Sequence, residues 1–118
     1  MTEIKRIATP YSYSSAVAAG DYVFLGLHRG FGADFATQFD DTFKNLQGTL
    51  AAFGLTLAQL VKVNVWLRHI GDLPDMEKRF GSTFEQGRFP ARMTATTEFV
   101  DADCLLMIDG VAFRAPQE

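Results

Sequence analysis

The stretch Arg88-Phe89-Pro90-Ala91-Arg92 leads directly into a strand-like segment, residues 93–100. Pro90 cannot donate a backbone hydrogen bond and biases Phe89 toward an extended conformation, so this stretch predicts an extended approach to a strand. The permanent charge of Arg92 at the mouth of that strand suits bidentate capture of a carboxylate. The alternative is an ordinary surface arginine paired with one of the acids of the chain.

The segments around this stretch alternate between strand-like and helix-like patterns. Strands are expected at residues 4–8, 22–27, 61–68, 93–100 and 104–113. The turn at 101–103 is short enough to join the last two strands as a hairpin. Residues 10–15 are dense in hydroxyl groups and are expected to form a loop.

Two helices are expected between these strands. The first carries apolar residues at spacings of four and three, which form one stripe: Phe39, Phe43, Leu46, Leu50 and Phe53. Gly54 follows them, where a left-handed C-cap falls. The second helix is expected to begin with Asp72 as its N-cap and Pro74 in its first turn. Its buried face is predicted to consist of Met76, Phe80 and Phe84.

The element order predicts an α+β fold with two helices on one face of a mainly antiparallel or mixed sheet, in one domain over residues 1–118. Several strands are apolar on both faces, as where Val23 and Leu25 alternate with Phe24 and Leu27. Because two helices cover only one face, we expect self-association to bury the other.

Composition excludes several classes of function. The chain has 118 residues and a net charge of −3, and its lysines and arginines are scattered, which disfavours a nucleic-acid partner. The single cysteine, Cys104, lies in an apolar run and fits a buried thiol in a reducing cytosol. No apolar stretch approaches the roughly 20 residues of a membrane span. We therefore expect a cytoplasmic protein without a membrane partner.

The sequence also resembles a known family. The element order, the stretch 89–92 and the closing Ile108-Asp109-Gly110-Val111-Ala112 are similar to the RidA/YjgF family of reactive-imine deaminases, some of which carry the older names endoribonuclease L-PSP or translation inhibitor. The resemblance runs from Tyr13 to Arg114. It implies a chorismate-mutase-like fold and a homotrimer with ligand clefts between subunits.

The resemblance implies roles for particular residues. Arg92 would bind the substrate carboxylate, and Tyr13, or alternatively Tyr11, would line the site. Active members use a glutamate on the last strand to position the hydrolytic water, but alignment places Met107 there. A thioether cannot accept a proton usefully.

Two other side chains are candidates for the missing proton acceptor. Asp109 points to the same side of its strand as Met107, displaced by roughly 6–7 Å. It is either a relocated acid or a structural partner of Arg92 or Arg114. His28 is the second candidate because it titrates near neutral pH, and the alternative is a solvated loop histidine.

The resemblance, taken with these residues, leaves three functions open. The first is hydrolysis of 2-imino acids or enamines to oxo acids and ammonia. The second is a non-catalytic trimeric module that binds small carboxylates such as 2-oxo acids. The third, an endoribonuclease, is disfavoured by the acidic balance and the scattered basic residues. No histidine, cysteine or carboxylate cluster has metal-ligand spacing, so neither a metal site nor another cofactor is expected.

Overall fold

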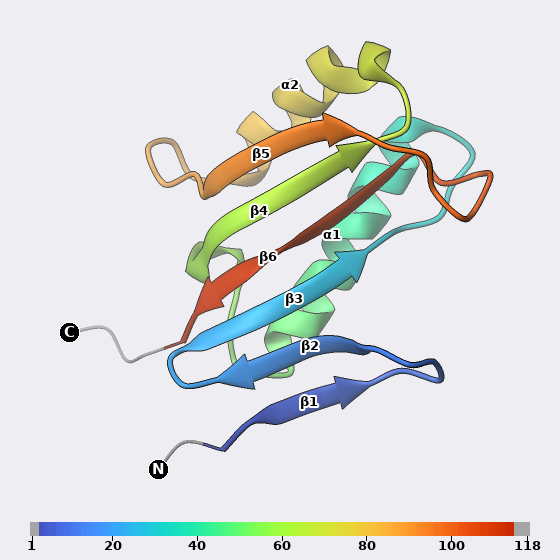
Figure 1. Ribbon diagram of the computed structural model, residues 1–118. Helices are drawn as coiled ribbons and strands as arrows, with labels where there is room; N and C mark the ends of the chain where they lie inside the picture. Colours follow the sequence, from blue (N-terminus) through green and yellow to red (C-terminus); the bar gives the residue numbers. More distant parts are fainter. Residues whose placement is uncertain (1–2, 115–118) are drawn as a thin grey trace.

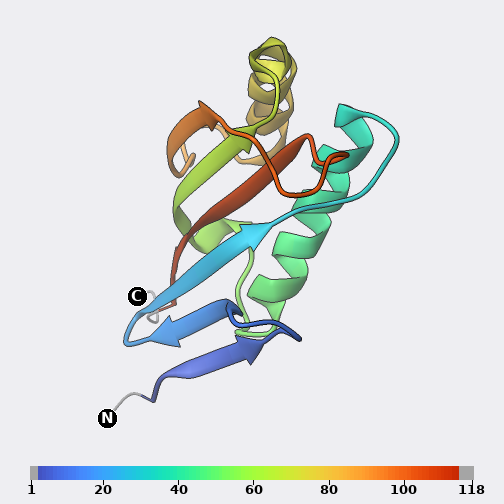
Figure 2. The ribbon, with the colours of Figure 1, turned by 45° about the vertical axis from the view of Figure 1, so that its right-hand side comes forward.

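The computed structural model describes residues 3–114, which form a six-stranded sheet with two α-helices along one face (Figures 1 and 2). The strand order is β1-β2-β3-β6-β4-β5. The elements are β1 Lys5–Ala8, β2 Ser14–Ala19, β3 Tyr22–His28, α1 Phe35–Ala51, β4 Leu60–Leu67, α2 Leu73–Thr83, β5 Ala91–Thr96 and β6 Leu106–Phe113, with 3-10 turns η1 Leu57–Gln59 and η2 Ile70–Asp72. The expected α+β class with a mixed sheet is confirmed.

Strand β2 was missed from the sequence. The predicted loop over residues 10–15 is wrong in its second part, because Ser14 and Ser15 already belong to β2. The strand pairs antiparallel with both β1 and β3, and it buries Ala16 and Ala18 against the core. Small alanines and serines alternate too weakly in polarity to signal a strand, yet they fit under a helix.

The predicted hairpin between the last two strands is also wrong. Strand β5 runs parallel to β4, whereas β6 lies between β3 and β4 and is antiparallel to both. Burial explains the difference: every second residue of β6 is fully covered, which suits a central strand, while the threonine-containing β5 is largely exposed and suits an edge.

The core lies between the sheet and the two helices. The predicted stripe of α1 is buried at Phe39, Phe43, Leu46 and Leu50, and Phe53 packs partly buried at its edge. On the α2 side, Met76, Phe80 and Phe84 are buried as expected. The Phe43 and Phe80 rings meet edge to face, with centroids 6.0 Å apart, and so join the two helices. Each such ring contributes about 1.5–3 kcal/mol by leaving water.

The predicted cap at the C-terminal end of α1 is present, whereas the predicted side-chain cap at the N-terminal end of α2 is not. Gly54 adopts a φ of +73°, and the N–H of Leu55 donates to the carbonyl of Leu50, as a left-handed C-cap requires. Asp72 stands at the N-cap of α2, but its side chain caps nothing. The reason is that η2 leads straight into α2, so Asp72 already has helical backbone angles.

The second apolar face inferred from the sequence is present. On the side of the sheet away from the helices, Tyr22, Phe24 and Leu27 of β3 are each about half exposed. Met107, Asp109 and Val111 of β6 lie on the same side, because the alternate residues of β6 are buried under the helices. We call this side the open face.

Candidate functional site

Arg92 lies near the start of the edge strand β5, with its side chain turned toward α2. It stands opposite Val63, which is buried on the helix side of the sheet. Its Nη2 donates to Glu77 Oε1 at 2.5 Å, and its guanidinium stacks 4.9 Å from the centroid of the Phe80 ring. The side chain is 25% exposed. The sequence offered pairing with an acid as the alternative for Arg92, and in this structure Arg92 does pair with an acid, Glu77.

The same arginine lines a cavity of about 280 Å³, which also involves Glu77, Phe80, Phe89 and Pro90. Among the described residues, only Nη2 of Arg92 has an acceptor, and that contact uses one of its two N–H groups. The second N–H of Nη2 therefore remains free, together with either Nε–H or one N–H of Nη1, and such an edge matches the two oxygens of a carboxylate. The buried Phe80 ring shields one face of the guanidinium from water, which strengthens a charged hydrogen bond there.

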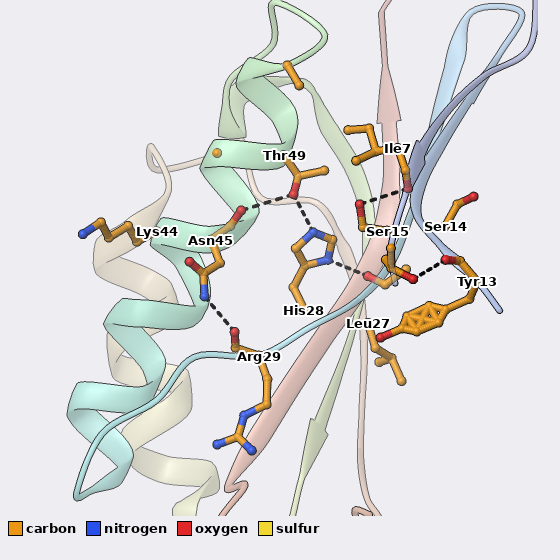
Figure 3. Close-up of a pocket in the computed structure, with 14 residues that line it drawn as sticks. Ile7, Tyr13, Ser14, Ser15, Leu27, His28, Arg29, Lys44, Asn45 and Thr49 are labelled. Atoms are coloured by element: carbon orange, nitrogen blue, oxygen red, sulfur yellow. Dashed lines mark hydrogen bonds between the residues drawn. The ribbon is translucent and has the colours of Figure 1, made fainter. Parts of the chain in front are cut away.

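A second cavity, of about 690 Å³, lies between α1 and strands β1–β3 (Figure 3). Asn45 and Thr49 reach into it from α1, and Tyr13 lies on the opposite side. Tyr13 lines this cavity and Tyr11 does not, although the two rings stack with centroids 6.2 Å apart. The structure therefore favours Tyr13 over Tyr11 as the tyrosine facing a cavity.

His28 ends β3 beneath the second cavity and is only 8% exposed, so the solvated-loop alternative is wrong. Its Nδ1 lies 2.7 Å from the carbonyl oxygen of Gly26, and its Nε2 lies 2.8 Å from Thr49 Oγ1. A carbonyl only accepts, so Nδ1 carries the proton. Burial lowers the pKa of His28, which favours a neutral ring. The Thr49 hydroxyl also lies 3.3 Å from the carbonyl oxygen of Asn45. Both nitrogens are therefore engaged within the fold.

Asp109 lies on the open face, on the same side of β6 as Met107, as expected from strand alternation. Its Oδ1 accepts from Asn64 Nδ2 at 2.7 Å, and its Oδ2 accepts from Trp66 Nε1 at 3.0 Å. The predicted pairing with Arg92 or Arg114 is wrong. Both donors stand on β4, the strand that the sequence did not place beside β6.

The arginines proposed as partners of Asp109 are held elsewhere. Arg92 turns to the helix side of the sheet, and Arg114 Nε donates to the carbonyl of Gly20 at 2.8 Å. Met107 stands opposite Trp66 and helps to line an apolar cavity of about 340 Å³ on the open face. Its side chain supplies surface there, and no acid–base group.

The candidate residues thus fall into three places in one chain. Tyr13 and His28 share the cavity beside α1, Arg92 lies at the other edge of the sheet, and Asp109 lies on the open face. Glu77 was not foreseen, because its contact with Arg92 depends on the parallel pairing of β4 and β5. Its position one turn before Phe80, on the same side of α2, was the available signal.

No helix within residues 3–114 is long and apolar enough to cross a membrane. In this part of the chain, no three histidine, cysteine, aspartate or glutamate side chains gather in a way that could hold a metal ion.

Comparison with known proteins gives a consistent result. A family model described as Endoribonuclease L-PSP matches residues 3–114. A YjgF family protein from Streptococcus pyogenes has a TM-score of 0.85 at 32% identity, with 96% of this chain and 98% of that chain covered. A YjgF family protein from Neisseria meningitidis has a TM-score of 0.90 at 24% identity, with 98% of both chains covered. A protein of Dermatophagoides farinae named 2-iminobutanoate/2-iminopropanoate deaminase is 28% identical over 108 residues, which cover 80% of this chain and 84% of the relative.

Proposed function

The chain belongs to the RidA/YjgF family, and on that premise we propose that it binds small carboxylate-bearing metabolites, namely 2-imino or 2-oxo acids, through Arg92. The observation that carries this proposal is the free guanidinium edge of Arg92 inside a cavity walled by Phe80 and Phe89. A carboxylate there would gain two charge-assisted hydrogen bonds. The aromatic walls suit the short apolar chain of such an acid.

We further propose that two copies of the chain complete each site. Arg92 and Tyr13 lie toward opposite edges of one sheet, so a neighbouring copy is needed to bring such residues into one cleft. The half-exposed aromatic side chains of the open face favour assembly, because a patch of this kind is usually covered. A homotrimer with clefts between copies satisfies both features.

A second candidate function is hydrolysis of the bound imine, favoured by the relative whose name is 2-iminobutanoate/2-iminopropanoate deaminase. Water would add to the carbon of the protonated C=N group, the C–N bond would break, and a 2-oxo acid and ammonium would leave. The attacking water must give up a proton during this reaction. Arg92 and Asp109 of one chain lie on opposite sides of the sheet, so the proposed acceptor is Asp109 of a neighbouring copy, with Asn64 and Trp66 orienting its carboxylate.

Binding and turnover are tested separately. In ligand-observed NMR, 2-oxobutanoate should bind the unmodified protein, and Arg92→Ala should weaken binding at least about tenfold, as expected for one charged hydrogen-bonding group. Arg88→Ala is the matched control, because Arg88 is exposed and, within residues 3–114, pairs with nearby Glu85 alone. Equal binding by Arg92→Ala and the unmodified protein would contradict the proposal.

Turnover is measured as ammonia release from 2-iminopropanoate generated in situ by an amino-acid oxidase. Acceleration that is lost in both Arg92→Ala and Asp109→Asn supports the hydrolase with Asp109 as the acceptor. Binding without acceleration, over several imines, supports the non-catalytic module.

A further inference from the structure

Glu77 is the charged neighbour of the proposed carboxylate site, and neither role above uses it. We propose that Glu77 makes this site selective for zwitterions, which carry a protonated nitrogen on the carbon beside the carboxylate. Protonated 2-imino acids and 2-amino acids belong to this class, whereas 2-oxo acids do not. The inference rests on the proposed function, since Arg92 must hold the ligand carboxylate.

The contacts of Glu77 leave half of its carboxylate available. Glu77 belongs to α2, which lies beside β5 (Figure 1), and only its Oε1 accepts from Arg92. Within residues 3–114, Oε2 has no donor, and the side chain is 61% exposed at the cavity. Oε2 can therefore accept a hydrogen bond from a ligand N–H group while Oε1 keeps its contact with Arg92.

The position of the Arg92 guanidinium is restricted by its surroundings. The guanidinium of Arg92 lies over the Phe80 ring, and Phe80 is itself buried in the aromatic core. Stacking on a fixed ring restricts the plane of a guanidinium. The positive and negative groups stand side by side at the cavity, where a ligand with the opposite order of charges can contact both.

The charges of Arg92 and Glu77 interact differently with zwitterions and with 2-oxo acids. A zwitterion can place its carboxylate on the free edge of Arg92 and its cationic nitrogen on Glu77, so that every charge has an opposite neighbour. A 2-oxo acid brings only a negative charge and leaves it beside the Glu77 carboxylate. Like charges about 4–6 Å apart near a protein surface repel enough to change affinity by about tenfold or more.

The competing interpretation is that Glu77 only positions Arg92. The substitution Glu77→Gln separates the two ideas, because the amide oxygen still accepts from Nη2 while the negative charge is removed. A positioning role predicts equal changes for all carboxylates. A selectivity role predicts opposite changes for zwitterions and oxo acids.

The experiment compares alanine and 2-aminobutanoate with pyruvate and 2-oxobutanoate by NMR titration of the full-length protein. We expect the unmodified protein to prefer each amino acid to its oxo acid. Glu77→Gln should weaken binding of the amino acids about tenfold and strengthen binding of the oxo acids. Glu85→Gln, which changes an exposed acid that pairs with Arg88, is the matched control and should leave both affinities unchanged.

Different outcomes would overturn the role of Glu77 and the proposed binding of carboxylates by Arg92. The inference is overturned if Glu77→Gln changes both ligand classes by the same factor, or if the unmodified protein prefers oxo acids. The proposed function itself fails if no ligand binds, or if Arg92→Ala binds all four ligands as well as the unmodified protein does.

Discussion

Only one nitrogen of the Arg92 guanidinium donates a hydrogen bond to another of the described residues. Glu77 takes one N–H and Phe80 supports the plane of the guanidinium, while Nε and Nη1 stay without an acceptor among residues 3–114. A purely structural arginine in this chain looks different: Arg68 donates from Nε to Cys104 O and from Nη2 to Asp101 O. This contrast is the reason why we propose Arg92, and not Arg68, as the residue that binds the ligand.

The Asp109 carboxylate gives a stability prediction. In Asp109→Asn, one of the two donors on β4 would face an NH₂ group, so a hydrogen bond is lost and a polar group is left unmatched. We expect the free energy of unfolding to fall by about 1–2 kcal/mol. Urea denaturation followed by the fluorescence of Trp66, the single tryptophan, measures it.

The control for Asp109→Asn is Asp40→Asn, which removes the same charge from an exposed position of α1. Its effect should stay within about 0.5 kcal/mol. Equal stability of Asp109→Asn and the unmodified protein would show that the two hydrogen bonds do not form in solution.

The burial of His28 leads to a prediction of how the free energy of unfolding changes with pH. Burial holds the pKa of His28 below its ordinary value of 6.5, so the unfolded chain binds a proton more readily than the folded chain. The stability that neutral His28 contributes is present above that ordinary value and is lost as the pH falls below it. Urea denaturation between pH 5 and pH 8 should show a steeper acid loss in the unmodified protein than in His28→Gln. An identical slope in both proteins would contradict the assignment.

The partners of these residues could not be predicted from the sequence alone. Met107 and Asp109 were singled out correctly as side chains of a strand, since alternation is a local property. Arg92 was expected just before a strand and lies within β5 instead. The contacts of Asp109 with Asn64 and Trp66 depend on the pairing of β4 with β6, which joins residues far apart in the chain. The same holds for Glu77 and Arg92.

At the scale of elements, local patterns were sufficient for the helices and insufficient for the sheet. The stripe of α1 and the cap at Gly54 follow from periodicity within one segment. Strand order depends on which strands are covered on the helix side, and nothing in the turn at 101–103 shows that β6 continues to the centre of the sheet. The hairpin prediction failed for that reason.

The central position of β6 gives a prediction at Gly110. A Cβ atom at this position would stand 2.3 Å from the carbonyl oxygen of Lys62 on β4, so the two strands would have to move apart. Gly110→Ala should lower the free energy of unfolding by about 1–3 kcal/mol, the usual effect of overpacking. Chemical denaturation is the measurement.

The matched control is Gly81→Ala in α2, where an added Cβ meets nothing within 4 Å. Alanine is the better helix former, so this variant should gain about 0.5–1 kcal/mol. If Gly110→Ala were as stable as the unmodified protein, β4 and β6 would not approach each other as described.

At the scale of the whole molecule, the open face predicts assembly. Phe24, 48% exposed in the single chain, stands opposite Val111 near the middle of this face. We expect the unmodified protein to behave as a trimer, and Phe24→Glu to remain folded but to dissociate because a buried charge is costly. Light scattering after size-exclusion chromatography gives the mass, with Ile70→Glu as an exposed apolar control near α2. A monomeric unmodified protein at micromolar concentration would contradict the assembly.

The measurement that tests the central claim most directly is a crystal structure of the protein with pyruvate bound. The account predicts the pyruvate carboxylate within hydrogen-bonding distance of Arg92 Nε or Nη1, in the cavity beside Phe80 and Phe89. Pyruvate bound only in the cavity beside His28, with Arg92 still contacting Glu77 alone, would contradict it.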